Sequence, residues 1–262
     1  MTIKKHTLKF NHLVILASVV VLLGCGSKTL ELKSRSFKLG EPNADMNFPD
    51  PVETPIVPAP PVVPSFPQTL RGWLPEYTDY VETQVSVKYN FLREVSGTRI
   101  GTLCPDYSRL SQSLKLKFWS SLLYSIAVPE SGLLRTAIYL EQSLPVDRVT
   151  GLQIRSEGLL QLSYSDVVNY QYDGGDISWT ADRTRALADY ASLTRSGDPE
   201  RTLLNAYSNL NLGLFIMNRL VGNRPMESVQ TSFGRYWSSM RTSSTLFPKV
   251  MSGLKLNIPE CF

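Results

Sequence analysis

Prolines near the N-terminus divide this chain of 262 residues into parts that must fold in different ways. Nine of its seventeen prolines lie within the 26 residues from 42 to 67. Because proline fixes φ and has no backbone N–H, this stretch is unsuited to helices and central strands and favours extended polyproline II. At about 3.1 Å per residue it spans up to roughly 80 Å. We interpret residues 25–68 as a tether; the alternative is that Pro-Ala-Pro-Pro is a ligand for a proline-binding domain.

The residues that precede the tether have the pattern of an export signal. A cationic start leads into an apolar run over residues 13–23, which ends at Gly24 and Cys25. This run of about a dozen residues is shorter than the ~20 that a stable membrane span needs. The sequence Leu-Leu-Gly-Cys at 22–25 resembles the bacterial lipobox, which implies that residues 1–24 are removed and that Cys25 is lipidated. A plain signal peptide with a chance cysteine and an uncleaved anchor are the alternatives.

Lipidation of Cys25 would place the protein on a membrane. Several acyl chains bury CH₂ groups at about 0.8 kcal/mol each, which is enough for a stable anchor. Gly26 and Ser27 follow the cysteine, and the absence of Asp there resembles the signal for sorting to the outer membrane. We therefore expect a lipid-anchored protein of the bacterial cell envelope, on the outer membrane and facing the periplasm.

Charge and histidine content exclude several classes of function. The formal net charge is +4, but Lys4, Lys5 and Lys9 lie in the expected signal, so removing three charges leaves about +1. A nearly neutral chain lacks the basic surface that drives binding to nucleic acid. Both histidines, His6 and His12, also lie in the signal, which excludes His-based catalytic triads and His-ligated zinc from the mature protein. We expect no metal and no cofactor.

From about residue 69 the composition becomes that of a globular domain. With 42% hydrophobic and 19% charged residues, the chain can bury a core, unlike a disordered or a multi-span membrane protein. Apolar residues at i+4 spacing from Leu110 to Ile126 predict a core-facing helix that ends near Pro129. A second helix is expected from Asp198, because Asp-Pro-Glu supplies an N-cap, an N1 proline and an acidic first turn before an apolar face.

The rest of the domain gives weaker signals. Two more helices are expected around 182–194 and 226–243, loops over 144–156 and 164–180, and only 78–92 shows modest strand character. No internal repeat is found. The sequence therefore predicts a mainly α domain over residues 69–262, with at most a small sheet.

Apart from Cys25, the chain has one pair of cysteines, Cys104 and Cys261. In an exported protein an even pair predicts a disulfide, and two free thiols are the alternative. A bridge that closes a loop of more than 150 residues stabilises by roughly 4–5 kcal/mol in the chain-entropy model.

Glu130 is a candidate for chemistry because it lies at the C-terminal end of the first predicted helix, in Pro-Glu-Ser-Gly. The negative end of the helix dipole and apolar surroundings both raise the pKa of a carboxyl group. A glutamic acid that stays protonated near neutral pH can act as a general acid. A solvated carboxylate at the helix end is the alternative from these residues alone.

Three motifs follow one another in an order that resembles the lysozyme and soluble lytic transglycosylase superfamily. They are Glu-Ser-Gly at 130–132, Gly-Leu-Leu-Gln at 158–161 and Asn-Leu-Asn-Leu-Gly at 209–213, the last preceded by Asp-Pro at 198–199. The resemblance implies a lysozyme-like helical domain over roughly residues 104–262.

A longer stretch narrows the resemblance. Ser-Glu-Gly-Leu-Leu-Gln-Leu-Ser-Tyr at 156–164, with Cys-Pro at 104–105 and Tyr-Trp-Ser-Ser-Met-Arg at 236–241, looks like a lipoprotein branch of this superfamily. That branch includes a lysozyme of predatory bacteria that acts on deacetylated cell wall. What the resemblance implies is therefore an enzyme of the bacterial wall.

The superfamily resemblance implies cleavage of the β-1,4 bond between N-acetylmuramic acid and N-acetylglucosamine in peptidoglycan. Glu130 matches the catalytic acid, glycan strands are the expected partner, and we expect a monomer. For three of the candidate residues a structural role is an equal alternative to substrate binding. Tyr236 and Trp237 would then be core residues, and Asn209 would satisfy backbone groups. The candidate substrate-binding residues are Ser131, Ser156, Glu157, Gln161, Tyr164, Asn209, Tyr236 and Trp237.

The sequence departs from the superfamily pattern in two places. Glu130 precedes Gly158 by 28 residues, which is about a dozen more than usual, and Leu160 replaces a methionine. The insert reshapes one wall of the cleft and offers candidates for the second carboxylate that an inverting hydrolase needs to activate water. These candidates are Glu141, Asp147 and Glu157. Without such a base, lytic transglycosylases of the superfamily use the N-acetyl and 6-hydroxyl groups of the substrate, with one glutamate as acid and then base.

Two functions of different classes remain open. The first is a lipid-tethered peptidoglycan glycosidase, either a lysozyme or a lytic transglycosylase. The second is a non-catalytic lipoprotein for peptidoglycan binding or envelope assembly that keeps the fold. Glu130, Ser131 and Gln161 together favour catalysis, because a binding protein needs no acid at the helix end.

Overall fold

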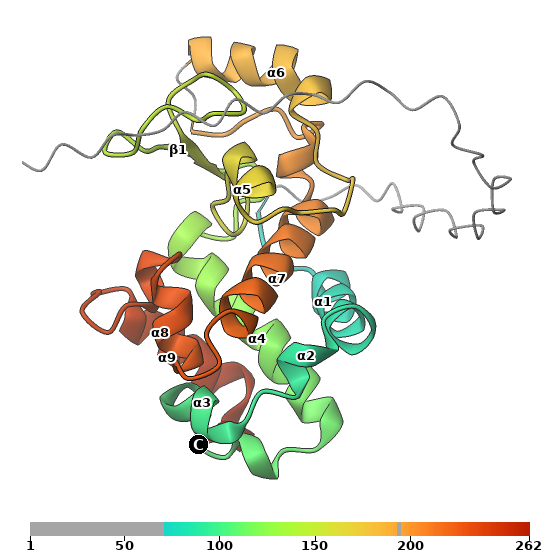
Figure 1. Cartoon of the computed structure of the whole chain (residues 1–262), viewed down its shortest axis with the longest axis vertical. Helices are drawn as coiled ribbons and strands as arrows, with labels where there is room; N and C mark the ends of the chain where they lie inside the picture. The colour runs from blue at the N-terminus through green and yellow to red at the C-terminus, as the bar shows by residue number, and fades with distance from the viewer. Residues whose placement is uncertain (1–70, 193–194) are drawn as a thin grey trace, which may run out of the picture. The chain divides into compact units, whose positions relative to one another are not determined.

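The computed structural model describes residues 71–192 and 195–262, which form a mainly helical domain with a two-stranded sheet (Figure 1). The predicted fold class is therefore confirmed. The export signal, Cys25 and the tether lie outside the described residues. None of the helices in the described part of the chain combines the length and the apolar character that a membrane span requires.

Helix α4 (Gln112–Ser131) carries Glu130 in its last turn. It begins after Ser111, whose Oγ accepts a hydrogen bond of 3.3 Å from a backbone N–H three residues later. It ends at Gly132, which has a φ of 59°, the left-handed conformation that glycine adopts without strain. The helix thus continues two residues past Pro129, where the sequence predicts its end, because the glycine and not the proline terminates it.

The segment predicted to have strand character, 78–92, is helical, and that prediction is wrong. It forms most of α1 (Pro75–Val87) and α2 (Asn90–Arg93). Val81 and Val85 are fully buried on one face of α1, four residues apart. The two valines are present because they pack in the core, and this packing outweighs the preference of valine for extended backbone.

Helix α7 (Ala206–Gly222) starts later than Asp198, the start that the sequence predicts. Its N-cap is Asn205, whose Oδ1 accepts hydrogen bonds from two backbone N–H groups at 3.0 and 3.3 Å. The preceding turn is held by Asp182, which accepts hydrogen bonds from the Thr202 N–H (2.8 Å) and hydroxyl (2.6 Å). The predicted apolar face of this helix is buried as expected, at Leu210, Leu214, Met217 and Val221.

Helix α6 (Trp179–Ser192) confirms the helix expected around 182–194. The helix expected over 226–243 is instead broken into α8 (Val229–Gly234) and η4 (Ser238–Met240). The shorter elements are α3 (Gly97–Ile100), η1 (Gly101–Leu103), η2 (Tyr107–Arg109), η3 (Thr202–Leu204) and η5 (Pro259–Cys261).

Helix α5 (Tyr164–Asn169) lies within the stretch 164–180 that is predicted to be a loop, so that prediction is wrong at its start. Ser163 and Asp166 form a capping box, in which the Ser163 N–H donates to Asp166 Oδ2 (2.7 Å). The Ser-x-x-Asp pattern was the sequence signal for this helix.

Strands β1 (Ile138–Leu140) and β2 (Arg155–Glu157) pair antiparallel, with Tyr139 opposite Ser156. The chain between them is irregular, which agrees with the loop predicted over 144–156 except at its last two residues. Figure 1 shows β1, α5 and α6 at one end of the domain and α3, α8 and α9 at the other, with α4 and α7 between them.

The two ends of the described chain are held to the central helices. Helices α1 and α9 (Phe247–Asn257) both pack against α4. Cys104 and Cys261 are buried and form the predicted disulfide, which joins the loop before α4 to η5. The position of Glu130 is therefore fixed by a helix that is packed along its length.

Candidate active site

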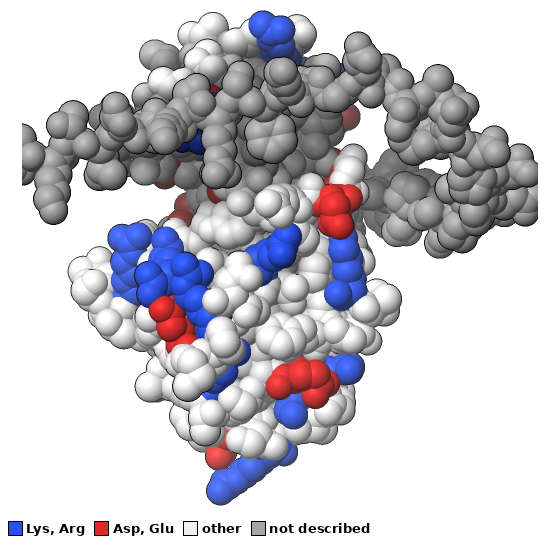
Figure 2. Space-filling model, viewed as in Figure 1, with Lys and Arg blue, Asp and Glu red and all other residues white. Residues whose placement is uncertain are grey.

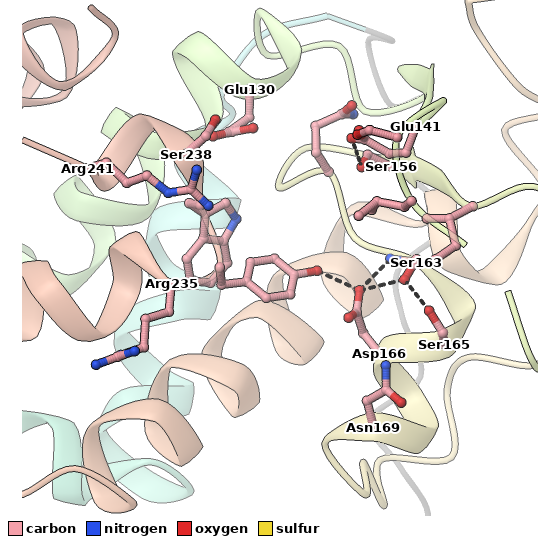
Figure 3. A pocket seen from close by; sticks show the side chains of 16 residues that line it. Glu130, Glu141, Ser156, Ser163, Ser165, Asp166, Asn169, Arg235, Ser238 and Arg241 are labelled. Atoms are coloured by element: carbon pink, nitrogen blue, oxygen red, sulfur yellow. Dashed lines mark hydrogen bonds between the residues drawn. The ribbon is translucent and has the colours of Figure 1, made fainter. Parts of the chain in front are cut away.

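A cavity of about 580 Å³ opens between the end of α4, the β1–β2 sheet, α5 and the segment from α8 to η4 (Figure 3). Its walls bring together residues that lie far apart in the sequence. Three carboxyl side chains, those of Glu130, Glu141 and Asp166, line it. The other lining residues are Ser143, Leu144, Ile154, Ser156, Gln161, Ser163, Ser165, Asn169, Arg235, Tyr236, Trp237, Ser238 and Arg241.

Glu130 is half-buried on the α4 side of the cavity. Ser239 donates a hydrogen bond from its Oγ to Glu130 Oε1 (2.6 Å). Burial raises the pKa of Glu130, the hydrogen bonds from Ser239 lower it in part, and the charge of Glu141 raises it. The arrangement favours a neutral carboxylic acid, which is the form that can donate a proton.

Glu141 lies across the cavity from Glu130, directly after β1 (Figure 3). Ser156 in β2 donates a hydrogen bond from its Oγ to Glu141 Oε1 (2.6 Å), which fixes the orientation of the carboxylate. The strand pairing sets this contact, because the Glu141 N–H donates to the Ile154 carbonyl (3.0 Å), two residues before Ser156. Of the three candidates for a second carboxylate, Glu141 is the one that lines the cavity with Glu130.

The structure places the other two candidates away from the cavity. Asp147 is buried and accepts hydrogen bonds from the N–H groups of Val149 (2.7 Å), Thr150 (3.2 Å) and Ser165 (3.1 Å), so its carboxylate holds the insert against α5.

Glu157 is also buried, in an ion pair with the buried Arg201, which in turn pairs with Asp189 (2.8 Å). Burial raises the pKa of Glu157, and Arg201 opposes that rise by stabilising the carboxylate. Glu157 therefore anchors the sheet to the rest of the domain rather than facing a substrate.

Residues 158–161 form a tight turn that brings Gln161 to the cavity. Gly158 has a φ of 78°, and a Cβ there would lie 2.3 Å from Asn209 Nδ2, so glycine is required for both conformation and space. Gln161 has a φ of 53°, and its Nε2 donates to the Gly158 carbonyl (2.8 Å). The left-handed backbone at Gln161 turns its side chain out of the core.

Asn209 is fully buried and serves this turn from α7. Its Oδ1 accepts from the Leu160 N–H (2.9 Å), and its Nδ2 donates to the carbonyls of Glu157 and Leu203 (3.1 Å each). The structure therefore favours the interpretation that Asn209 satisfies backbone groups. Leu160, which replaces the superfamily methionine, packs against Gly213 of α7.

Of the three aromatic residues predicted to bind substrate, two line the cavity and one lies in the core. Tyr236 and Trp237 line the cavity, but Trp237 is only 2% exposed and its Nε1 donates to the Leu160 carbonyl (2.9 Å). Tyr164 is buried and donates from its hydroxyl to Asp182 Oδ2 (2.7 Å). Ser131 donates to the carbonyl four residues earlier in α4 (3.0 Å) and does not line the cavity.

Several residues of the site were not predicted from the sequence. Asp166 lines the cavity from α5, and burial raises its pKa while hydrogen bonds from Tyr236 and Ser163 lower it. The Ser-x-x-Asp pattern at 163–166, typical of a capping box, is a sequence signal that could have identified Asp166. The positions of Ser239 and Arg241 depend on the break between α8 and η4, for which the sequence carries no evident signal.

Within residues 71–192 and 195–262, no three His, Cys, Asp or Glu side chains are grouped so that they could hold a metal ion. No protein-family model matches the sequence, and no curated protein matches it.

Solved structures do match the chain. Wild-type DslA aligns with a TM-score of 0.52 and 20% sequence identity, over 71% of this chain and 91% of that chain. Two DslA variants, each with a glutamate replaced by glutamine, give a TM-score of 0.51 at 20% and 19% identity with the same coverage. The described domain has a lysozyme-like fold. At these identities the likeness to DslA concerns the fold.

Proposed function

We propose that this protein is a peptidoglycan glycosidase that cleaves the β-1,4 bond between N-acetylmuramic acid and N-acetylglucosamine, with Glu130 as general acid. The observation that carries the proposal is the Glu130 carboxyl group, which lines a polar cavity at a helix end and has a pKa raised by burial. A carboxyl group in such surroundings retains its proton at a pH where an exposed glutamate has lost it.

The reaction would begin when Glu130 donates its proton to the glycosidic oxygen, as the bond from that oxygen to the anomeric carbon breaks. In a hydrolase, Glu141 would then accept a proton from the attacking water on the far side of the sugar. In a lytic transglycosylase, the Glu130 carboxylate would accept the proton of the 6-hydroxyl group, and a 1,6-anhydro product would form. The position of Glu141 across the cavity, and its hydrogen bond from Ser156, support the first route.

The DslA variants give further support to this pair. The two glutamates that are replaced in those variants lie eleven positions apart in the DslA chain. Glu130 and Glu141 are also eleven positions apart. Equal spacing in the same fold is expected if the two chains use matching carboxylates.

The test is mass spectrometry of the products released from purified cell wall, acetylated and deacetylated. We expect a reducing end from a hydrolase and a 1,6-anhydro end from a transglycosylase. Glu130→Gln should lower turnover by the ~10²–10⁴ typical of lost general acid catalysis, while wall binding survives. Glu260→Gln, at an exposed carboxylate outside the cavity, is the matched control. Near-normal cleavage by Glu130→Gln would contradict the proposal, and wall binding without cleavage by the wild type would favour a binding lipoprotein.

We further propose that a lipid on Cys25 and the tether over residues 25–68 hold the domain, as a monomer, on the outer membrane facing the periplasm. The export signal and the proline content support this arrangement. Cys25→Ser should abolish incorporation of labelled palmitate and leave unprocessed precursor. Undiminished labelling of that variant would rule out the lipid anchor.

A further inference from the structure

A second cavity, of about 320 Å³, adjoins the first and is distinguished by its charge. Asn169, at the end of α5, lines both cavities. Arg219 and Arg224 line the second cavity, and no carboxylate does. The remaining lining residues are Tyr170, Gln171, Leu220 and Asn223. We refer to it as the arginine cavity.

The charges of its two arginines are only weakly opposed by the protein. Arg219 reaches Gln171 Oε1 at 3.4 Å and lies over the ring of Phe215 at 5.4 Å, and neither partner carries a charge. Arg224 approaches Glu227 at 3.7 Å, a long separation for an ion pair.

Glu227 is shared with a closer partner. It also accepts hydrogen bonds from Arg235 and Ser232, and the hydrogen bond from Arg235 lowers the pKa of Glu227. One carboxylate therefore serves two guanidinium groups, which leaves a positive charge beside the arginine cavity. Figure 2 shows Lys and Arg side chains gathered over α8, with a smaller acidic group among them.

Hydrogen bonds from Arg99 hold the backbone at Arg224 in place, so this wall of the cavity has a defined structure. Arg99 donates from its Nη2 to the carbonyls of Arg224 (2.7 Å) and Val221 (3.0 Å), and from its Nε to the carbonyl of Glu227 (3.0 Å). These bonds tie the turn after α7 to the short helix α3. They fix the backbone from which the Arg224 side chain extends. Arginine suits carboxylate ligands, because its planar group donates two parallel hydrogen bonds.

We propose that the arginine cavity binds carboxylate groups of the stem peptide that muramic acid carries, so that the protein selects peptide-bearing glycan strands. This inference rests on the proposed function, because it takes the neighbouring cavity as the glycan site. The stem peptide is attached through the lactyl group of muramic acid and leaves the sugar away from the glycan axis. In the arginine cavity, beside the glycan site, the negative charges of the stem peptide would lie close to Arg219 and Arg224.

The test is equilibrium binding, measured by calorimetry on the full-length protein. The probes are the disaccharide N-acetylglucosaminyl-N-acetylmuramic acid with a tetrapeptide and the same disaccharide without it; both lack the scissile bond. We expect the peptide to tighten binding by about tenfold or more, since hydrogen bonds to charged groups are the stronger kind. In Arg219→Gln/Arg224→Gln the ratio of the two dissociation constants should fall towards one.

The matched control is Arg183→Gln on α6, an exposed arginine that lines neither cavity, and it should keep the wild-type ratio. The single variants Arg219→Gln and Arg224→Gln replace the double variant if circular dichroism shows that the double variant is unfolded. A wild-type ratio near one, or an unchanged ratio in the arginine variants, overturns the inference. A wild type that binds the peptide-bearing probe but cleaves no wall would remove the proposed function and leave this binding site standing.

Discussion

The Tyr236 hydroxyl donates a hydrogen bond of 2.5 Å to Asp166 Oδ2, and this bond joins the segment after α8 to the first turn of α5 (Figure 3). The same oxygen accepts hydrogen bonds from the Ser163 N–H (2.7 Å) and hydroxyl (2.8 Å). One carboxylate oxygen thus caps a helix and holds the two sides of the cavity together. The Asp166 carboxylate therefore helps to set the shape of the cavity.

Removing the hydroxyl in Tyr236→Phe should lower the free energy of unfolding by about 1–2 kcal/mol, because a buried carboxylate loses one of its donors. Urea denaturation at neutral pH measures the change. Tyr139→Phe is the control, since Tyr139 is 63% exposed and its change should stay within about 0.5 kcal/mol. Equal stability of the two variants would show that the bond contributes nothing.

Stability should depend on pH through Glu130. Burial raises the pKa of Glu130 above the ordinary value of 4.5, so between those two values the folded state binds more protons than the unfolded state. Stability therefore falls as pH rises through that window. Glu130→Gln lacks this titration, so we expect it to lose less stability than the wild type as the pH rises above 4.5. Denaturation curves across this range measure the effect, and parallel wild-type and variant profiles would contradict it.

Glu141→Gln should separate the two reaction routes. If Glu141 activates water, the variant should lose about 10²-fold or more in hydrolysis, as for other removed general bases. Ser156→Ala should produce a smaller loss in the same direction, because Glu141 keeps its charge but loses the hydrogen bond that orients it. Product analysis of both variants on purified wall measures this. Full activity in Glu141→Gln, with anhydro products throughout, would assign the reaction to Glu130 alone.

Asn209→Ala should be strongly destabilising without any contribution from substrate. The variant leaves the Leu160 N–H and the Leu203 carbonyl unpaired, whereas the Glu157 carbonyl keeps its hydrogen bond from the Leu162 N–H (2.9 Å). At about 1–3 kcal/mol for each unpaired group, we expect a loss of at least about 2 kcal/mol. Asn90→Ala, at an exposed position, should change stability by less than about 0.5 kcal/mol. Thermal unfolding of the two variants gives the comparison, and a stable Asn209→Ala with weakened wall binding would return Asn209 to the list of substrate contacts.

The helices could be predicted where the spacing of apolar residues along the sequence matches the face of the helix that is buried in the structure. The apolar stripes of α4 and α7 identified both helices, because each stripe packs against other helices. The start of α7 was misplaced because the capping signal at Asp198 competes with contacts from Asp182, which the sequence does not place nearby. In α1, the valines were interpreted as strand residues because valine is common in strands. Their spacing of four residues, which is typical of a helix, was given less weight.

The site was predictable only in part, for a related reason. Glu130, Ser156 and Gln161 line the cavity, whereas Glu157 and Tyr164, from the same motif as Ser156 and Gln161, are buried in the core. Ser156 and Glu157 face opposite ways because they alternate along β2, and the left-handed backbone at Gln161 is a property of the folded turn. Sequence spacing alone does not predict the conformation at Gln161.

The disulfide also affects how the domain would respond to proteolysis. All residues that line the cavity lie between Cys104 and Cys261, inside the covalent loop. Arg148 itself is exposed, as are residues 142–146, so Arg148 is a candidate site for proteases that cut after basic residues. After one cut there, Glu130 and Asp166 would lie on different peptides that the bridge still links. A gel would show one band without reductant and two bands with it, and a nicked enzyme could keep both walls of its cleft together.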